Sequence, residues 1–404
     1  MHDMRAQGSQ LVLIMSLAQA AGMLGFGVFP ALLPGFIEQW SLSESQAGWL
    51  NGIFFAGYMV SVPLLVSLTD RHDARVVFLF ASALSLAAMV GFALLAQDFW
   101  SALVLRALHG VGFAGAYMPG LKVLTDRLDD RNPSRAVAFY TASYSIGAGL
   151  SFYLAGVIDA ALGWPWAFAL LAAGSAIAFV LVVLSTAPQA PIPEDGTRLL
   201  DFRPILRNRR ALAYMLAYAL HTGELMAIGT WLVAFLSFSA ALQADGAAGW
   251  SITAVAAVAT VIALPASLLG NEGAIRFGRR RMVGVLMVCC AMLGCLTGFS
   301  ATWPFWIVVA LCLTYGAAQA SDSASLTAGT VMSAEPGRRG ATMAVHSFVG
   351  FAGGFLGPVV FGGALDLAGG RDQPFAWSMA FAAVALPTAL GPLILRRLAR
   401  PTAK

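Results

Sequence analysis

Residues 188–210 read PQAPIPEDGTRLLDFRPILRNRR and separate two apolar parts of similar length. The stretch opens with three prolines, which cannot continue a helix, and then carries five arginines spaced among leucine, isoleucine and phenylalanine. Such a pattern is typical of a Pro-rich break followed by a short basic amphipathic helix on a membrane face. We therefore expect a cytoplasmic linker with a basic amphipathic segment, joining an N-terminal membrane bundle (1–187) to a C-terminal one (211–404).

The composition is that of a membrane protein. Of 404 residues, 59% are hydrophobic and 11% are charged, whereas a soluble domain is about 25% charged. A water-soluble fold of this size could not cover so much apolar surface, so lipid must be its solvent. The four cysteines lie inside apolar runs without the paired spacing of a disulfide or metal site, and we expect no metal and no cofactor.

Twelve apolar runs are long enough to cross a bilayer, which takes about 20 residues. Apolar segments of this length form helices in lipid, so we expect an all-α membrane protein with twelve transmembrane helices. The first run is longer than the core of a signal peptide, and we expect it to remain as a span. The expected spans are 11–36, 47–69, 76–96, 100–124, 136–160, 166–187, 211–238, 248–270, 282–301, 305–331, 341–367 and 375–395.

The distribution of Lys and Arg indicates the orientation of the spans. Positive residues gather in short cytoplasmic loops. With both termini inside, all but two of the 24 Lys and Arg lie in predicted cytoplasmic segments or the adjoining ends of spans. The exceptions are Arg106 and Arg371. No soluble surface gathers these charges, so the net charge of +4 does not indicate nucleic-acid binding. We expect an integral protein of a bacterial inner membrane.

The two halves of the chain repeat each other. A basic segment precedes the third span at 70–75, DRHDAR, and another precedes the ninth at 276–281, RFGRRR. An arginine opens and an aspartate closes both the fifth and the eleventh span. A duplicated six-span unit is a common construction among secondary transporters.

These motifs resemble the Major Facilitator Superfamily. The family's loop between spans 2 and 3 has the form G-x-x-x-D-R-x-G-R-R/K. Asp70, Arg71 and Arg75 match this form, whereas Val66 and Asp73 stand where the family has glycine. The resemblance implies two pseudo-symmetric six-helix bundles around a central cavity, and transport by alternating access.

The second half keeps part of the same loop, at Arg276, Gly278 and Arg279. The segment RALHGVG that begins at Arg106 resembles the family's fourth-span motif R-x-x-x-G-x-G. The resemblance implies that the two loops form a cytoplasmic gating motif. The alternative is that their arginines only set the topology.

One stretch of the fourth span matches a nucleotide-binding pattern. Residues 110–115, GVGFAG, fit the dinucleotide pattern GxGxxG. They lie within a continuous apolar run without a preceding strand, so we interpret them as small residues that let two helices approach closely. No P-loop sequence is present, and an ATP-driven pump would therefore need a separate subunit.

Glycine and proline gather in spans 1 and 11. Examples are Gly25 and Gly27 in the first and Gly357 and Pro358 in the eleventh. We expect them to loosen both spans, as a cavity that opens alternately to two sides requires.

Ionisable residues within the spans are the candidate binding groups, because a charge at membrane depth is costly unless it is paired or hydrated. Arg106, Glu224 and Asp322 are the clear cases, and His221 lies one turn from Glu224 on the same helix face. The alternative is that each charge is a structural pair. Uncharged or weakly basic residues that we expect to line the same site are Gln319, Tyr117, Tyr144, Asn51 and His346.

The sequence predicts a secondary active transporter, a monomer, that moves a small organic solute. A carboxyl group in a water-poor cavity can bind a proton on one side of the membrane and lose it on the other, so Glu224 is the first candidate for proton coupling and Asp322 the second. The fifth span lacks the GP-x-x-GG pattern of proton antiporters in the family, and the direction stays open. An uncoupled facilitator and a non-transporting membrane sensor are the alternatives. No nucleophile–base arrangement or HExxH spacing indicates an enzyme.

Overall fold

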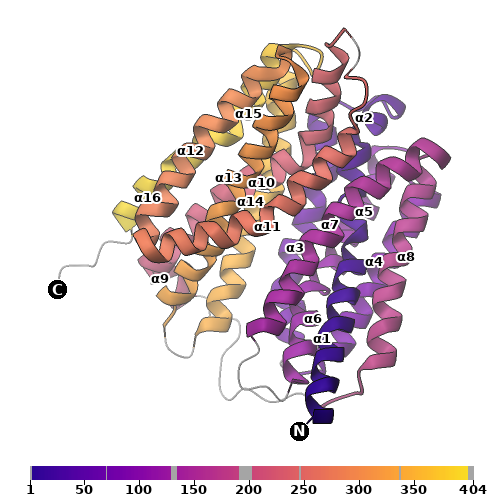
Figure 1. Ribbon diagram of the computed structural model, residues 1–404, viewed down its shortest axis with the longest axis vertical. Coiled ribbons are helices and arrows are strands. Elements are labelled where there is room, and N and C mark those ends of the chain that lie inside the picture. The colour runs from indigo at the N-terminus through magenta and orange to yellow at the C-terminus, as the bar shows by residue number, and fades with distance from the viewer. Residues whose placement is uncertain are drawn as a thin grey trace. The chain divides into compact units, whose positions relative to one another are not determined.

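The computed structural model describes residues 2–69, 71–128, 134–190, 203–244, 247–335 and 338–398. All regular elements in these ranges are helices, and twelve of the described segments are long and apolar enough to cross a membrane (Figure 1). The predicted all-α fold with twelve spans is therefore confirmed.

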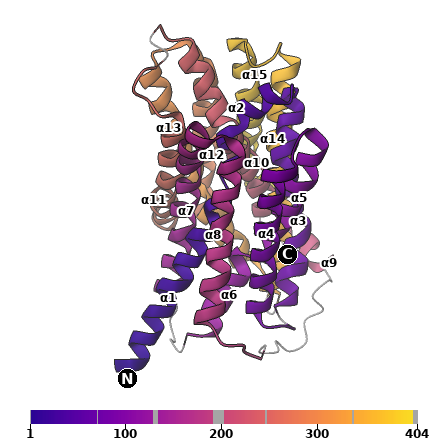
Figure 2. The same ribbon diagram turned by 90° about the vertical axis from the view of Figure 1, so that its right-hand side faces the viewer.

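The contacts divide the chain into two units, and the first takes residues 1–32 and 57–196. Within it, α4 packs against both α5 and α8, and α1 packs against α7 and α8 (Figure 2). The elements that lie wholly in unit 1 are α1 (His2–Gly22), η1 (Met23–Gly25), α4 (Ala74–Leu95), α5 (Phe99–Ala114), α6 (Tyr117–Asp126), α7 (Ser134–Leu162) and α8 (Trp164–Ser185).

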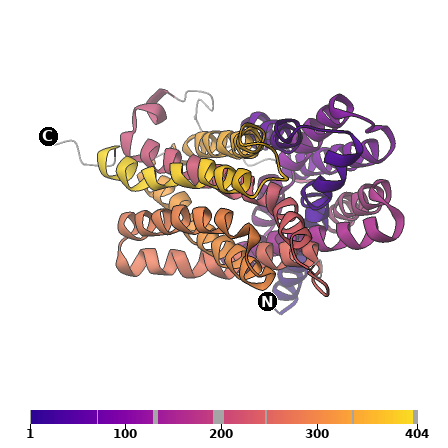
Figure 3. The same ribbon diagram turned by 90° about the horizontal axis from the view of Figure 1, so that it is seen from above.

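Unit 2 takes residues 33–56 and 197–404. Its long helices, from salmon α11 to yellow α16, run alongside one another in Figure 3. The elements that lie wholly in unit 2 are α9 (Arg203–Arg207), α10 (Arg209–Ala241), α11 (Ile252–Phe277), α12 (Arg279–Phe299), η2 (Ser300–Thr302), α13 (Phe305–Ser333), α14 (Arg339–Leu367), α15 (Pro374–Ala385), η3 (Leu386–Leu390) and α16 (Gly391–Leu398).

Two helices contribute to both units. They are α2 (Val28–Gln39) and α3 (Glu44–Leu68), and their residues 33–56 group with the helices of unit 2. The sequence-based domains follow the linear order of the chain, whereas the contacts assign this segment to helices far along the sequence.

Only part of the predicted linker lies among the described residues. Residues 191–202 lie outside them, and the basic amphipathic segment corresponds to α9. Its buried Ile205 packs with Ala211 and Val345 of unit 2. The side chain of Asn208 then accepts a hydrogen bond of 3.1 Å from the N–H of Ala211, which caps the start of α10.

The spans begin and end close to their predicted limits, and the eighth differs most. We predicted its end at Gly270, but α11 continues to Phe277. The polar residues after Gly270 stay helical because Asn271 accepts a hydrogen bond of 3.3 Å from the hydroxyl of Ser325 on α13. The helix ends at Gly278, whose φ of 91° favours glycine.

The first span breaks where its glycines lie, between α1 and α2. The hydroxyl of Ser151 accepts a hydrogen bond of 2.8 Å from the N–H of Gly27 and donates one of 2.6 Å to the carbonyl of Leu24. A Cβ at Gly25 would lie 3.0 Å from Nε2 of His109. The break is thus stabilised by a side chain that satisfies the backbone groups left without helical partners.

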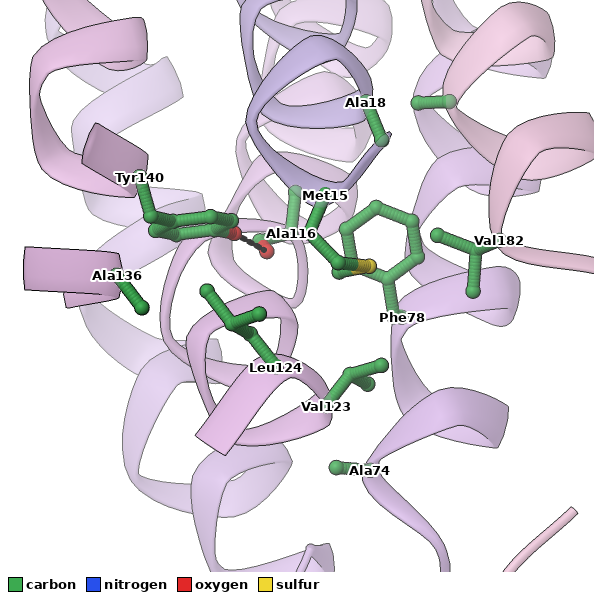
Figure 4. Packing of buried hydrophobic residues seen from close by; sticks show 11 residues of the cluster. Met15, Ala18, Ala74, Phe78, Ala116, Val123, Leu124, Ala136, Tyr140 and Val182 are labelled. Atoms are coloured by element: carbon green, nitrogen blue, oxygen red, sulfur yellow. Dashed lines mark hydrogen bonds between the residues drawn. The ribbon is translucent and has the colours of Figure 1, made fainter. Parts of the chain in front are cut away.

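The core of unit 1 joins α1, α4, α6, α7 and α8 through side chains far apart in the sequence (Figure 4). The sulfur-bearing side chain of Met15 lies beside the ring of Phe78, with Val123 and Val182 close by. Tyr140 is fully buried, and its hydroxyl donates a hydrogen bond of 3.3 Å to the carbonyl of Ala116. Lipid is as apolar as these side chains, so close packing rather than exclusion from water holds the helices together.

The glycines of the fourth span let α5 pack closely on α4. A Cβ at Gly112 would lie 2.6 Å from the backbone N of Ser85, and one at Gly115 would meet the Cβ of Ala81 at 2.5 Å. This packing supports the interpretation of residues 110–115 as small interface residues rather than a nucleotide loop.

The glycines of the eleventh span have the same role, and the expectation that they loosen it is wrong. The helix α14 is continuous from Arg339 to Leu367 and includes Pro358. A Cβ at Gly353 would clash with the carbonyl of Ala219, and one at Gly357 with the carbonyl of Gly223. The missing side chains thus permit α10 and α14 to lie in backbone contact.

Replacing Gly357 with alanine should destabilise the protein, because the added methyl group would force α10 and α14 apart. Overpacking of this kind costs about 1–3 kcal/mol, which we expect as a clear fall in the unfolding temperature of the detergent-purified protein. Gly316→Ala on α13 is the matched control, since nothing lies within 4 Å of a Cβ at that position. Equal unfolding temperatures for the two variants would contradict the proposed close contact.

Candidate functional site

A cluster of buried polar side chains joins α10 and α13 in unit 2. It contains His221 and Glu224 on α10, three residues apart, and Tyr315, Gln319 and Asp322 on α13, at i, i+4 and i+7. These spacings place each set on one helix face. All five residues are at most 3% exposed. We call these five residues the α10–α13 cluster.

Each carboxyl group of the cluster has a partner on the other helix. The hydroxyl of Tyr315 donates a hydrogen bond of 2.5 Å to Oε1 of Glu224. The Nδ1 atom of His221 lies 2.7 Å from Oδ1 of Asp322. This close contact does not have the geometry of a hydrogen bond, because Oδ1 of Asp322 has no hydrogen-bond partner among the described residues. The cluster therefore places an imidazole and a carboxyl group side by side in a buried helix interface.

The two carboxyl groups also interact with each other. Glu224 and Asp322 are close enough for the charge of one to act on the other. Gln319 precedes Asp322 by three positions on α13 and is within reach of Glu224, but its Nε2 makes no well-formed hydrogen bond to any described residue. A buried amide donor without an acceptor is costly. It is also available to an incoming polar group.

Space for the Tyr315 hydroxyl comes from a glycine on a third helix. A Cβ at Gly294 of α12 would lie 2.6 Å from the Tyr315 hydroxyl oxygen. Glycine there lets the hydroxyl point at Glu224 from within the closely packed bundle. The sequence analysis did not include Tyr315, although its spacing from Gln319 and Asp322 places it on their face.

An aromatic stack extends the cluster to α14. The ring of Tyr218 lies between two imidazoles, 5.7 Å from His221 and 4.1 Å from His346, at interplanar angles of 27° and 23°. Nδ1 of His346 lies 3.2 Å from the hydroxyl of Thr330, and Nε2 lies 3.4 Å from that of Thr327. Through Tyr218, the structure thus connects His346 to His221, which in turn contacts Asp322.

Asn51 contacts α10 at another position. Its amide donates a hydrogen bond to the hydroxyl of Thr230, which itself donates one of 2.6 Å to the carbonyl of Met226. Thr230 follows Glu224 by six positions, or about 9 Å along the helix. Asn51 therefore attaches α3 to α10.

Arg106 belongs to unit 1 and is almost fully buried, at 1% exposure. Its Nη1 lies 3.5 Å from Nδ1 of His109, and its Cζ lies 4.7 Å from the centre of the Phe29 ring. A guanidinium over an aromatic face is stabilised by the negative charge of the ring face. The arginine is thus held by its surroundings in unit 1.

Tyr117 and Tyr144 also lie in unit 1, with ring centres 5.8 Å apart. The hydroxyl of Tyr140 lies 3.0 Å from the carbonyl oxygen of Tyr117 and 2.8 Å from Oε1 of Gln19, and it can donate its one proton to either acceptor. These tyrosines form an aromatic group with Phe26, whose ring centre is 5.9 Å from that of Tyr144. Packing accounts for both predicted tyrosines.

In the loop between α3 and α4, the contacts that the structure describes for the motif are made by Asp73. Asp70 lies outside the described residues, and Arg71 is exposed. Asp73 caps α4 and accepts hydrogen bonds of 3.0 Å at both oxygens from Nη2 of Arg127. The Gln189 N–H donates a further one of 2.8 Å. The sequence analysis treated Asp73 only as a replaced glycine and missed this role.

The predicted Arg75 fastens the same end of α4 to the end of α8. Its Nε donates to the hydroxyl of Thr186 at 3.1 Å, and its Nη2 donates to the carbonyl of Val183 at 3.3 Å. Asp73 and Arg75 together therefore hold α4, the end of α6 and the end of α8 at one face of unit 1.

The Asp73 carboxyl is stabilised in its charged form. Burial on its own would raise the pKa of Asp73, but the N–H groups of Gln189 and Arg75 and the guanidinium of Arg127 outweigh it and hold the pKa below its usual value.

The second-half copy of the motif makes weaker contacts. Arg276 pairs with Glu272 at 2.8 Å, but both side chains are more than half exposed, and such pairs contribute little. Gly278 links α11 to α12. Arg279 contacts the sulfur of Met332, a weak acceptor.

A contact that the sequence analysis missed lies at the other end of unit 2. The Asp366 carboxylate at the end of α14 accepts hydrogen bonds from the N–H groups of Glu44, at 3.0 Å, and Ser45, at 2.8 Å. These N–H groups begin α3, so the carboxylate satisfies the positive end of that helix. Arg371 lies 3.6 Å from Glu38 and 3.7 Å from Glu44.

The described residues contain no group of three or more His, Cys, Asp or Glu that could hold a metal ion.

Comparison with known proteins identifies the family. The sequence model of the Major Facilitator Superfamily matches residues 15–248. The chain belongs to this family. The resemblance drawn from the loop and fourth-span motifs is thereby confirmed.

Two curated relatives of the chain have names that describe them as transporters. The sphingosine-1-phosphate transporter of Danio rerio is 23% identical over 243 residues, which are 54% of this chain and 47% of the relative. A protein of Cupriavidus pinatubonensis named "Probable 4-methylmuconolactone transporter" is 27% identical over 317 residues, 69% of each chain. The chain spans about half or less of the length of the vertebrate relatives it matches.

Two solved structures share the fold. A bacterial homologue of the human lysosomal transporter Spinster, in an inward-facing and occupied conformation, has a TM-score of 0.73 at 16% identity, covering 97% of this chain and 95% of the other. The nucleoside transporter NupG has a TM-score of 0.75 at 14% identity, covering 98% and 99%. At these identities the likeness establishes the fold.

Replacing Asp73 with asparagine should lower the unfolding temperature at neutral pH, because hydrogen bonds to a charged group contribute about 1.5–3 kcal/mol. The pKa of Asp73 is depressed in the folded protein, so this stabilisation is present above the unfolded-state pKa of about 3.9 and is lost as the pH falls through the lower folded-state value. The difference between wild type and variant should stay constant from about pH 7 to pH 5 and shrink below about pH 4.

Asp126→Asn is the control for this measurement, made on the detergent-purified protein. Asp126 pairs with Lys122 at 3.4 Å on the same helix, and its side chain is 25% exposed. Its removal should change the unfolding temperature little at any pH. If the difference between wild type and Asp73→Asn does not shrink as the pH falls below about 4, the charged form of Asp73 is excluded as its source.

Proposed function

We propose that this protein is a proton-coupled secondary active transporter that moves a small organic solute across the membrane by alternating access. The observation that carries the proposal is the α10–α13 cluster, in which two carboxyl groups, an imidazole, a phenol and an amide lie buried at membrane depth. Charged groups at this depth are costly and generally serve transport of ions or solutes. The family and the names of its curated relatives support a transporter.

The contacts within the cluster support proton coupling. The imidazole of His221 and the carboxyl group of Asp322 lie 2.7 Å apart and offer a proton two neighbouring binding groups, and Glu224 is close enough to act on Asp322 electrostatically. Glu224 is the proposed proton carrier, since Tyr315 donates to one of its oxygens and can do so whether or not the carboxyl is protonated. Asp322 is the second candidate, with His221 as its neighbouring base at 2.7 Å.

Substrate recognition is assigned to the unmet donor of the cluster and to Arg106. The Nε2 of Gln319 would donate to an oxygen or ring nitrogen of the solute, which relieves the cost of its burial. Arg106 would attract an anionic group, since its positive charge is buried in unit 1. His346 would lie beside the solute as the last ring of the stack that Tyr218 forms with His221.

The membrane setting is part of the proposal. We place the protein in a bacterial inner membrane with both termini in the cytoplasm, because Lys and Arg concentrate in the loops that this orientation puts inside. One chain supplies both halves of the transporter, so a monomer suffices. The chain needs no cofactor for this mechanism.

Access to the site would be controlled by the cytoplasmic gating motif, which comprises Asp70, Arg71, Arg75, Arg276, Gly278 and Arg279. In unit 1, Asp73 and Arg127 complete this motif by bracing α4. At the opposite end of the spans, Asp366 must release the start of α3 whenever that end of unit 2 opens.

The substrate can be identified by thermal shift, since a ligand stabilises the folded protein by about 2.7 kcal/mol at 100 times its dissociation constant. We would screen the detergent-purified protein against organic anions, cations and neutral solutes at pH 5.5 and pH 7.5. The relatives provide the first solutes, 4-methylmuconolactone and a nucleoside. Loss of an anion's effect in Arg106→Ala would assign Arg106 to the binding site.

Coupling is then measured with the identified solute in proteoliposomes. Glu224→Gln and Asp322→Asn should each reduce accumulation driven by a pH gradient by tenfold or more, because neither side chain can then exchange a proton. Tracer counterflow, which needs no net proton movement, should persist. Glu272→Gln is the matched control, since this carboxylate lies on α11 and is 52% exposed in a pair with Arg276.

The alternatives correspond to distinct outcomes of this experiment. Wild-type counterflow without any response to a pH gradient would identify an uncoupled facilitator. Binding without counterflow would identify a membrane sensor. If Glu224→Gln and Asp322→Asn both leave gradient-driven transport intact, the assignment of the α10–α13 cluster to coupling is wrong.

A further inference from the structure

A cavity lies where three helices of unit 2 begin or end. Its volume is about 430 Å³, and four arginines line it together with Tyr214 and Met332: Arg210, Arg279, Arg280 and Arg281. Arg210 is the second residue of α10, the other three open α12, and Met332 precedes the last residue of α13.

The backbone around this cavity favours an anion. The helix α12 extends over 21 residues, and its first N–H groups have no helical acceptors. Gly278 precedes it in a conformation with φ of 91°, so the chain turns sharply into the helix and Arg279–Arg281 follow without a break. The positive end of the helix and the arginines therefore add their charges at one place.

Neutralising carboxylates are lacking in the described lining of the cavity. None of its residues is acidic. The acidic residues nearest in sequence have other partners, since Glu272 pairs with Arg276 at 2.8 Å and Glu335 with Arg338 at 3.6 Å. The concentration of positive charge is thus not compensated by the lining residues.

One of the arginines has an unsatisfied donor. The Nε of Arg279 is buried and has no hydrogen-bond partner among the described residues. The described hydrogen bond of its Nη1 goes to the thioether sulfur of Met332. A thioether sulfur is a weak acceptor. A guanidinium in this state lacks the oxygen acceptors that its planar set of N–H groups is suited to bind.

The position of the cavity indicates the source of those oxygens. Three spans, Arg209–Ala241, Arg279–Thr302 and Phe305–Ser333, have an end at the cavity. Span ends lie at the depth of lipid headgroups, and basic pockets between transmembrane helices bind anionic headgroups there. Tyr214 and Met332 give the same cavity an apolar side suited to the glycerol and first methylenes of a lipid.

We propose that this cavity binds the phosphate group of an anionic phospholipid. Arg279 supplies paired N–H donors to the phosphate oxygens, and Arg281 and Arg210 supply further positive charge. The start of α12 contributes its backbone N–H groups. The bound lipid would hold the beginning of α12 against α10 and the end of α13.

The test compares lipids on the full-length protein in mild detergent. Phosphatidylglycerol should raise the unfolding temperature in a saturable manner, whereas phosphatidylcholine should not. Glycerol 3-phosphate carries a similar phosphate without acyl chains, and at the same concentration it should have no effect. Native mass spectrometry of the same samples should detect one additional phosphatidylglycerol retained by the wild type.

Variants locate the effect. Arg279→Gln combined with Arg281→Gln should weaken the apparent affinity for phosphatidylglycerol at least tenfold. Arg207→Gln is the matched control, because this exposed arginine lies in the same unit and does not line the cavity. If the double variant does not fold, Arg279→Lys keeps the charge and removes the planar donor set, and it should still weaken binding severalfold.

Three results would overturn the proposal. They are an equal stabilisation by phosphatidylcholine, an unchanged affinity in the variants that fold, and an effect of glycerol 3-phosphate equal to that of the lipid. The last would identify a site for soluble phosphate compounds. Solute transport is not required for any of these measurements, so this proposal and the proposed function can fail separately.

Discussion

The absence of water within a bilayer is the constraint on which this structure depends. Each backbone N–H and C=O in a span must find its partner inside the protein, and a helix satisfies almost all of them locally. Where a helix stops within the membrane, a side chain takes over, as Ser151 does at the break in the first span. For the same reason a buried charge in a span destabilises the protein unless a specific partner or water compensates it, and such charges commonly mark functional sites.

In lipid, the packing of helices depends on how closely their backbones approach each other. Lipid offers apolar contacts as good as those of another helix, so helices gain by approaching closer than lipid can. Glycine is the residue that allows this, and it brings α14 against α10 and α5 against α4. The close α10–α14 pair in turn fixes the rings of Tyr218 and His346 at 4.1 Å, since a Cβ at Gly350 would meet the Tyr218 ring. The close backbone contact between α10 and α14 therefore helps to position Tyr218 and His346 beside the α10–α13 cluster.

Much of the fold could be predicted because hydropathy and charge act locally. A run of apolar residues is sufficient evidence for a span, and charges such as Glu224 and Asp322 within such a run mark candidate sites. The partner of a charge cannot be deduced in this way. Tyr315 is 91 positions from Glu224, and Arg127 is 54 from Asp73, and spacing along one helix does not say which other helix faces it.

The error at span 11 has a similar origin. A glycine weakens a helix only if nothing uses the space it leaves, and the sequence cannot show that the carbonyl of Ala219 or Gly223 lies in that space. Gly25 and Gly27 fulfil the expectation because Ser151 stabilises the broken backbone. The same residue type thus has opposite effects in spans 1 and 11, depending on a contact from elsewhere in the chain.

The contact between Asp366 and the start of α3 has a consequence for biosynthesis. The two partners are 322 positions apart, and at about 5–20 residues per second the ribosome needs on the order of tens of seconds to make the intervening chain. During that interval the first turn of α3 is already inserted but has no carboxylate at its N–H groups. Gly48 and Gly52, which finally lie against Pro358 and Phe355, face lipid or an insertion factor in the meantime. Completion of the eleventh span is therefore the step at which the second span reaches its final packing.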